Sequence, residues 1–175
     1  MEKNSFYLIT GVMASGKSTV AEALARRFQK GVHVRGDVFR RMIVSGREEM
    51  SAQPSPTAIQ QLRLRYDLAA QVARMYFDQG FSVVLQDNYY GEELANMLKR
   101  LDGYPVRAVV LQPRVAVVAQ REQQREKRGY IGFEVESLYE AFVKDTPRLG
   151  FWLDNSDCSV EQTVDAILAH FDGQK

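Results

Sequence analysis

The sequence has too few cysteines and histidines for a disulfide scaffold or a zinc-stabilised fold. Its single cysteine, Cys158, cannot form an internal disulfide, and we expect it to be a small, partly buried packing residue in a reducing compartment. The two histidines, His33 and His170, lie far apart in the chain and near no cluster of cysteines. A zinc site is therefore not expected.

Long apolar runs and an excess of charge of one sign are missing as well. No segment approaches the ~20 apolar residues of a membrane helix. The apolar stretch FYLITGVMA near the N-terminus is short and is followed closely by Lys17, which does not fit a signal peptide. We therefore expect a cytoplasmic protein with no membrane partner. The net charge of +1 argues against a protein committed to nucleic acid, although a local basic segment is present.

Short β-rich runs alternate along the chain with segments of helical periodicity. The expected strands are 5–10, 32–35, 81–87, 105–112 and a last one within 150–156. The expected helices are 17–30, 37–46, 57–79, 92–101, one after Pro113, 134–144, and one that starts from a capping box of Ser159 and Gln162. This alternation predicts one α/β domain, residues 1–175, with a mostly five-stranded parallel sheet in a three-layer α/β/α arrangement.

The stretch GVMASGKST, residues 11–19, matches the phosphate-binding pattern G-x-x-x-x-G-K-[ST] between an expected strand and an expected helix. The two glycines allow the loop to curl so that its backbone N–H groups point into one concavity, where the helix dipole also favours anions. Lys17 then reaches the β- and γ-phosphates of ATP, and the Ser18 hydroxyl is a ligand for Mg²⁺. The residues expected to bind the nucleotide here are Gly11, Ala14, Ser15, Gly16, Lys17, Ser18 and Thr19.

Several other nucleotide-binding classes fit less well. The dinucleotide pattern G-x-G-x-x-G and the guanine-reading pattern N-K-x-D of GTPases are both absent, and the chain is too short for an oligomeric motor domain with its sensor elements. The class that fits is a small kinase of the P-loop NTPase, nucleoside-monophosphate-kinase-like type. Such an enzyme needs a base near the acceptor and a mobile, arginine-rich lid.

Asp37 is the candidate base. It follows the second expected strand, in VHVRGD, so in a parallel sheet it lies at the same edge as the phosphate-binding loop. A carboxylate there could take the proton of an acceptor hydroxyl during phosphoryl transfer. The alternative is an ordinary capping aspartate for the helix that follows.

The candidate lid carries Arg121, Arg125 and Arg128 on one helical face, in a segment near residues 121–134. Like charges in this arrangement repel one another unless an anion lies opposite, which suggests an anionic partner. Closure of the lid would bring Arg125 and Arg128 onto the phosphoryl group. The alternative is a solvated helix in which interleaved glutamates neutralise the arginines.

The chain resembles a family of small P-loop kinases that act on hydroxyls, namely the chloramphenicol phosphotransferase and zeta-toxin group and the polynucleotide 5′-hydroxyl kinases. The resemblance covers most of residues 5–156 and rests on GVMASGKST, RGDVFRRMI, VVLQDN and VVAQREQQREKRG in this order. It implies that Asp37 is the catalytic base and that Arg40 or Arg41 contacts the acceptor.

The resemblance also implies roles for the lid and for the end of the third strand. Arg121 would stack on adenine, and Arg125 would contact phosphate. Asp87 would position Mg²⁺ through water or hold the acceptor, although Gln86 stands where the strand would otherwise continue apolar.

The acceptor pocket is expected between the Asp37 helix, the long helix 57–79 and the residues after Asp87. Arg40, Arg41 and Tyr89 are candidate acceptor contacts, whereas Tyr89 could instead close an edge of the core. We favour a small-molecule acceptor such as an antibiotic, a sugar or a nucleotide sugar. A polynucleotide 5′-hydroxyl kinase is the alternative, and a non-catalytic nucleotide-binding or toxin-type module is a second one. The sequence indicates no oligomeric state.

Overall fold

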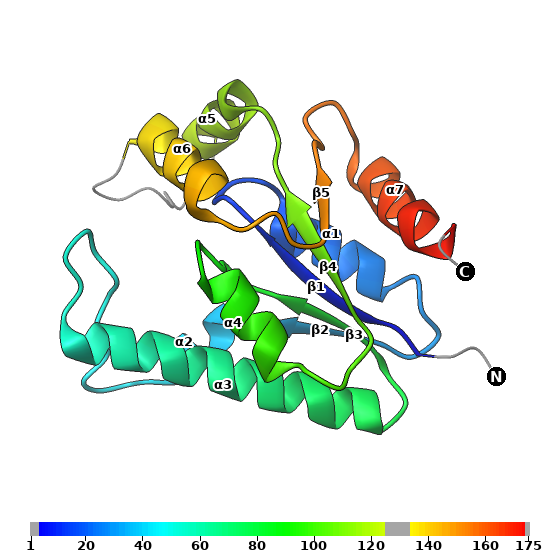
Figure 1. The fold of residues 1–175 in the computed structure, drawn as a ribbon, viewed down its shortest axis with the longest axis horizontal. Coiled ribbons are helices and arrows are strands. Elements are labelled where there is room, and N and C mark those ends of the chain that lie inside the picture. Colours follow the sequence, from blue (N-terminus) through cyan, green and yellow to red (C-terminus); the bar gives the residue numbers. More distant parts are fainter. Residues whose placement is uncertain (1–3, 125–133, 174–175) are drawn as a thin grey trace.

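The computed structural model describes residues 4–124 and 134–173. Five strands form one sheet in the order β2-β3-β1-β4-β5, and every pairing between neighbours is parallel (Figure 1). The strands are β1 (Phe6–Gly11), β2 (Gly31–Arg35), β3 (Ser82–Gln86), β4 (Val106–Leu111) and β5 (Phe151–Leu153). The predicted three-layer fold with a five-stranded parallel sheet is therefore confirmed.

Helices cover both faces of this sheet (Figure 1). They are α1 (Lys17–Ala25), α2 (Asp37–Arg41), α3 (Pro56–Asp78), α4 (Glu93–Arg100), α5 (Val115–Gln123), α6 (Val135–Asp145) and α7 (Val160–Asp172). Helices α1 and α7 pack on one face of the sheet, and α3, α4, α5 and α6 pack on the other face. None of the helices in the described ranges is both long enough and apolar enough to cross a bilayer.

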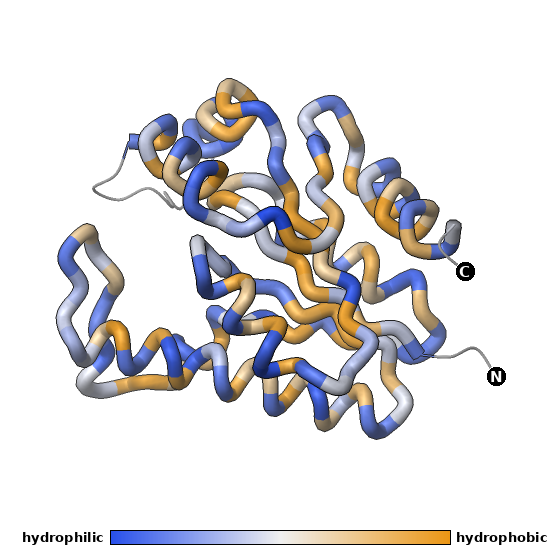
Figure 2. The backbone as a smooth tube through the Cα atoms, viewed as in Figure 1, coloured by the Kyte–Doolittle hydropathy of each residue, from blue (hydrophilic) through white to orange (hydrophobic). Residues whose placement is uncertain are grey.

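The core has two parts because successive residues of a strand point to opposite faces of the sheet. Phe6 and Leu8 of β1 join the apolar cluster on the α3 side, whereas Tyr7 and Ile9 join the cluster on the α1 side. All six residues of β1 are buried, as expected of a central parallel strand covered on both faces. Figure 2 shows the hydrophobic colour concentrated along the central strands.

Two helix starts follow directly from the sequence. The Ser159 hydroxyl accepts a hydrogen bond from the Gln162 N–H at 3.1 Å, and the Gln162 side chain accepts one from the Ser159 N–H at 2.8 Å. The predicted capping box is therefore confirmed. Ser55 caps α3 in a similar way, with Pro56 in the first turn, where its missing N–H costs nothing.

The carboxyl ends of the strands place the functional segments at one edge of the sheet. Gln86 of β3 pairs with Ile9 of β1 on one side and with Arg35 of β2 on the other. The chain that leaves these three strands therefore emerges at the same edge, and that edge is where open parallel sheets bind ligands. It contains the phosphate-binding loop, the start of α2 and Asp87.

Candidate functional site

The loop from Gly11 to Lys17 is held in a shape that few residues allow. Gly11 has φ +148°, and a Cβ atom at this position would lie 2.3 Å from the Leu111 carbonyl oxygen, so only glycine fits so close to the end of β4. Ala14 has φ +62°, a left-handed conformation that costs about 1 kcal/mol for a residue with a side chain. Strain of this kind is often found where a loop is shaped to bind a ligand.

Two side chains from distant parts of the chain fix the peptide between Ser15 and Gly16. The Ser15 carbonyl oxygen accepts hydrogen bonds from Asn155 Nδ2 at 3.1 Å and from Arg121 Nη1 at 3.3 Å. Because N–H and C=O point in opposite directions in a trans peptide, the Gly16 N–H is turned away from both donors. Asn155 lies shortly after β5 and is a site residue that was not predicted from the sequence. A polar residue just after a strand could have indicated it, because that position lies at the functional edge of a parallel sheet.

Lys17 and Ser18 begin α1 at the end of this loop. The Lys17 ammonium donates a hydrogen bond to the Val12 carbonyl oxygen at 2.6 Å, and the residue is only 7% exposed. The Ser18 hydroxyl donates to Gln86 Oε1 at 3.2 Å. A cation, a hydroxyl and a helix N-terminus thus meet in one place, which is the chemistry required to hold phosphates.

A cavity of about 400 Å³ opens beside the loop. It brings together side chains from α1, α2, α3, α5 and the ends of β2 and β3. Of the predicted site residues, its lining includes Ala14, Gly16, Lys17, Ser18, Thr19, Asp37, Arg41, Asp87 and Arg121. Gly11 and Ser15 are buried behind the lining and shape the loop from within. The predicted lid residues Arg125 and Arg128 lie outside the described residues.

Asp37 lies in the same cavity as Lys17 and Ser18. Its carboxylate is 2.6 Å from Arg41 Nη2 and 3.7 Å from Arg35 Nε, and its side chain remains 29% exposed. Asp37 is the first residue of α2, where the sequence predicted the helix to begin, and Gly36 precedes it in an α-helical conformation. The carboxylate is therefore free of capping hydrogen bonds and is held by arginines.

Asp87 is turned to the opposite side of β3 from Ser18, toward α3. Arg65 of α3 donates hydrogen bonds to both carboxylate oxygens. Its Nε lies 2.7 Å from Oδ2, and its Nη2 donates to Oδ1. Burial works to lower the pKa of Arg65, but the attraction of Asp87 outweighs it and leaves this pKa above its usual value.

Gly36 lies against this ion pair, so a larger residue at position 36 should destabilise the protein. A Cβ atom here would lie 2.0 Å from Asp87 Oδ2, although φ −63° and ψ −32° suit any residue. Gly36→Ala should therefore lower the free energy of unfolding by about 2 kcal/mol, through overpacking alone. Thermal unfolding should show the melting temperature fall by about 5 °C. Gly173→Ala, with similar backbone angles and a nearest contact of 3.3 Å, should change it little, and equal shifts in both variants would contradict this account.

Two predicted acceptor residues do not reach the cavity. Arg40 points to Glu49 in the loop after α2 and forms an ion pair with it. Tyr89 is 0% exposed, its ring lies 5.1 Å from that of Tyr66, and its N–H donates to Thr10 Oγ1. Tyr89 therefore closes an edge of the core, the alternative considered from the sequence, because the chain turns inward directly after β3.

The site offers oxygen ligands suited to Mg²⁺. Ser18 supplies a hydroxyl and Gln86 an amide oxygen, which are hard ligands. In the described part of the chain, no group of three or more His, Cys, Asp or Glu residues could hold a metal ion by itself. This donor set fits a Mg²⁺ ion that is bound mainly by nucleotide phosphates and water, as is usual for this ion.

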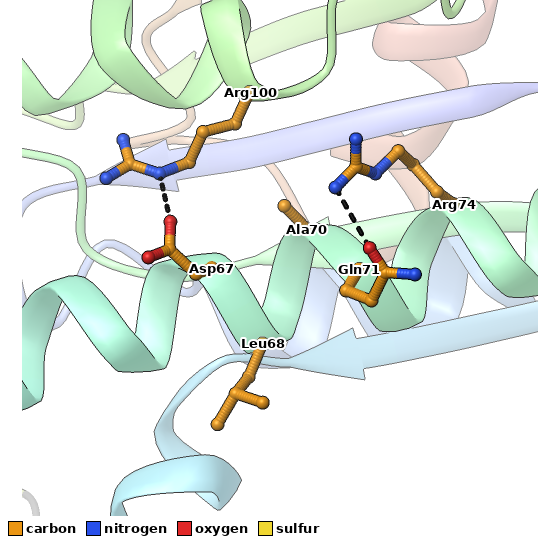
Figure 3. A pocket seen from close by; sticks show the side chains of 6 residues that line it. All are labelled: Asp67, Leu68, Ala70, Gln71, Arg74 and Arg100. Atoms are coloured by element: carbon orange, nitrogen blue, oxygen red, sulfur yellow. Dashed lines mark hydrogen bonds and ion pairs between the residues drawn. The ribbon is translucent and has the colours of Figure 1, made fainter.

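A larger hollow of about 480 Å³ lies elsewhere, where the end of α4 meets α3 (Figure 3). Its charged side chains are occupied by neighbours: Arg100 of α4 contacts Asp67 of α3 at 2.7 Å, and Arg74 donates to Gln71 of the same helix at 3.1 Å. It contains no phosphate-binding loop and no catalytic set. Size alone does not identify a site, and the chemistry places the functional site in the smaller cavity beside Lys17.

A comparison with known families and structures agrees with this geometry. Residues 7–139 match the family model described as AAA domain. No curated protein matches the sequence.

Among solved structures, the chain is similar to an unliganded sugar kinase from Janibacter sp. HTCC2649, with TM-score 0.69 and 19% identity over 97% of this chain and 95% of that one. It is similar to the tunicamycin resistance protein of Deinococcus radiodurans, with TM-score 0.71 and 16% identity over 96% and 95%. A chain of the Pnkp1/Rnl/Hen1 RNA repair complex also matches, with TM-score 0.63 and 19% identity over 83% of this chain and 44% of that one. At these identities the similarity is one of fold.

Proposed function

The chain belongs to this AAA-domain family of P-loop proteins, and from that premise we propose that it is an ATP-dependent kinase. It moves the γ-phosphate of Mg-ATP to a hydroxyl group of a small-molecule acceptor. The observation that carries the proposal is that Lys17 and Ser18, which suit a nucleotide, share one cavity with Asp37 and Arg41, which suit an acceptor.

The proposed reaction exchanges one phosphorus–oxygen bond for another. The acceptor oxygen bonds to the γ-phosphorus, the bond from that phosphorus to the β–γ bridging oxygen breaks, and ADP leaves. Asp37 takes the proton from the acceptor hydroxyl, and its ion pair with Arg41 orients its carboxylate. Lys17 and the loop N–H groups hold the phosphates. Ser18 and Gln86 would hold a Mg²⁺ ion, which would supply positive charge to neutralise part of the phosphate charge.

Several features support a small-molecule acceptor. Two of the similar structures are named as a sugar kinase and as an antibiotic resistance protein. Among the described residues beyond the cavity, Arg40 and Arg47 both pair with Glu49, which dilutes the positive charge that a nucleic-acid strand would need.

A polynucleotide 5′-hydroxyl kinase is the second candidate, favoured by the similarity to a chain of an RNA repair complex. Its acceptor strand would be held through phosphates, so its binding would weaken steeply with added salt.

The experiment that tests the proposal is a screen with γ-labelled ATP. The acceptors are an aminoglycoside, a macrolide, a phenicol, a nucleotide sugar and an oligonucleotide, and label should move to one of the small molecules. Label on the oligonucleotide, with salt-sensitive binding, would select the second candidate. Slow hydrolysis that no acceptor stimulates would instead indicate a non-catalytic nucleotide-binding module.

Lys17→Ala tests the nucleotide half of the site. Calorimetry should show the affinity for Mg-ATP fall about a hundredfold, because the ammonium that faces the phosphates is lost. Lys99→Ala, on the exposed side of α4, should leave this affinity unchanged. Equal affinities of the wild type and Lys17→Ala would show that the loop does not hold the triphosphate.

A further inference from the structure

Two neighbouring side chains at the end of β3, Gln86 and Asp87, face opposite sides of the sheet, and Gln86 is the one that faces Ser18. Val84 belongs to the apolar cluster on the α1 side of the sheet, and Leu85 belongs to the cluster on the α3 side. By strand alternation, Gln86 faces α1 and Asp87 faces α3. The contacts agree, since Gln86 Oε1 accepts from Ser18 of α1 and Asp87 is bound by Arg65 of α3.

In P-loop enzymes the nucleotide's Mg²⁺ is held by the hydroxyl of the phosphate-binding loop and by an aspartate at the end of a nearby strand. The position opposite that hydroxyl is here occupied by a neutral amide. Asp87 is directed to other partners: its two oxygens accept from Arg65, and Oδ1 also accepts from the Asn88 N–H at 2.7 Å.

We infer that Gln86 takes the place of the metal-binding acid, as the positioning residue that faces Ser18 and the Mg²⁺ of the bound nucleotide. Its amide oxygen carries a dipole but no net charge, so β3 adds no carboxylate to the coordination of the cation. Asp87 is assigned instead to the acceptor side, where with Arg65 and Gly36 it supports the turn that carries Asp37. This inference rests on the proposed binding of Mg-ATP but not on the acceptor or on catalysis.

The inference predicts a specific coupling between metal and nucleotide. A carboxylate introduced at 86 would attract Mg²⁺ and repel phosphates that carry no metal. Gln86→Glu should therefore bind Mg-ATP more tightly and metal-free ATP more weakly than the wild type. The ratio of the two affinities should rise roughly tenfold. Gln86→Ala, which removes the amide oxygen, should lower this ratio.

The test is calorimetry with ATP in excess Mg²⁺ and with ATP in a chelator, on each variant after circular dichroism has shown that it is folded. Gln71→Glu adds the same charge on the exposed face of α3, and its affinity ratio should match that of the wild type. Arg65→Met/Asp87→Leu removes the ion pair between these two residues without changing the net charge, and it should keep the wild-type ratio, since Asp87 faces away from Ser18.

Two results would overturn the inference: an unchanged ratio in both Gln86 variants, or a ratio that falls in Arg65→Met/Asp87→Leu and not in Gln86→Ala. The second result would return the metal role to Asp87. Failure of the proposed function has a different signature, because a wild-type protein that binds ATP neither with nor without Mg²⁺ would remove the nucleotide site itself.

Discussion

Asp37→Asn is expected to bind Mg-ATP as the wild type does and to transfer the γ-phosphate about a thousandfold more slowly. Asparagine has nearly the same size, but its amide cannot take the proton of the acceptor hydroxyl. The carboxylate lies in the cavity with Lys17, and the basic side chains it contacts among the described residues are Arg41 and Arg35, so its loss should leave the nucleotide half of the site intact. Calorimetry with Mg-ATP and single-turnover transfer of labelled phosphate measure the two effects separately.

The matched control is Asp67→Asn, which removes an exposed carboxylate of α3 that also pairs with an arginine. This variant should transfer phosphate at the wild-type rate, because Asp67 lies in the other hollow. If Asp37→Asn were as fast as the wild type, another group would have to be the base. If it lost ATP binding as well, Asp37 would be needed to shape the nucleotide site.

Much of the fold was predictable because the sequence carries its strongest signals at the strands. The apolar runs in β1, β3 and β4 have the composition of buried parallel strands. The loop of glycines and lysine directly after β1 marks the carboxyl edge of the sheet as the edge that binds phosphate. In a parallel sheet, residues that directly follow strands reach the same edge. The placement of Asp37 near Lys17 therefore followed from topology alone.

The parts of the site that could not be predicted depend on tertiary contacts or on one-residue differences in register. Whether Gln86 or Asp87 faces Ser18 depends on which residue of β3 pairs with Ile9, and a shift by one residue exchanges them. Asn155 reaches Ser15 across 140 residues of chain. Tyr89 is buried because its N–H donates to Thr10 and its ring packs against that of Tyr66. Both partners are distant in sequence, so the residues around Tyr89 do not predict these contacts.

Arg65→Met is expected to destabilise the protein by about 4 kcal/mol, because it leaves the Asp87 carboxylate buried without its partner. The two side chains are only 12% and 2% exposed, so water cannot replace the guanidinium. Thermal unfolding should show a fall in melting temperature of about 10 °C. Arg100→Met also breaks an arginine–aspartate pair of α3, but that pair is more exposed, and its loss should cost less than about 1 kcal/mol.

The pH dependence and a double variant separate lost charge pairing from lost packing. Burial raises the pKa of Asp87, and removal of Arg65, which opposes this effect, should raise that pKa further. The folded variant then binds a proton more readily than the unfolded chain, so its stability relative to the wild type should recover as the pH falls. Arg65→Met/Asp87→Leu leaves no buried charge and should regain most of the lost stability at every pH. A deficit that is independent of pH and persists in the double variant would mean that Arg65 acts through its packing on α3, and that Asp87 is not held in place by an ion pair.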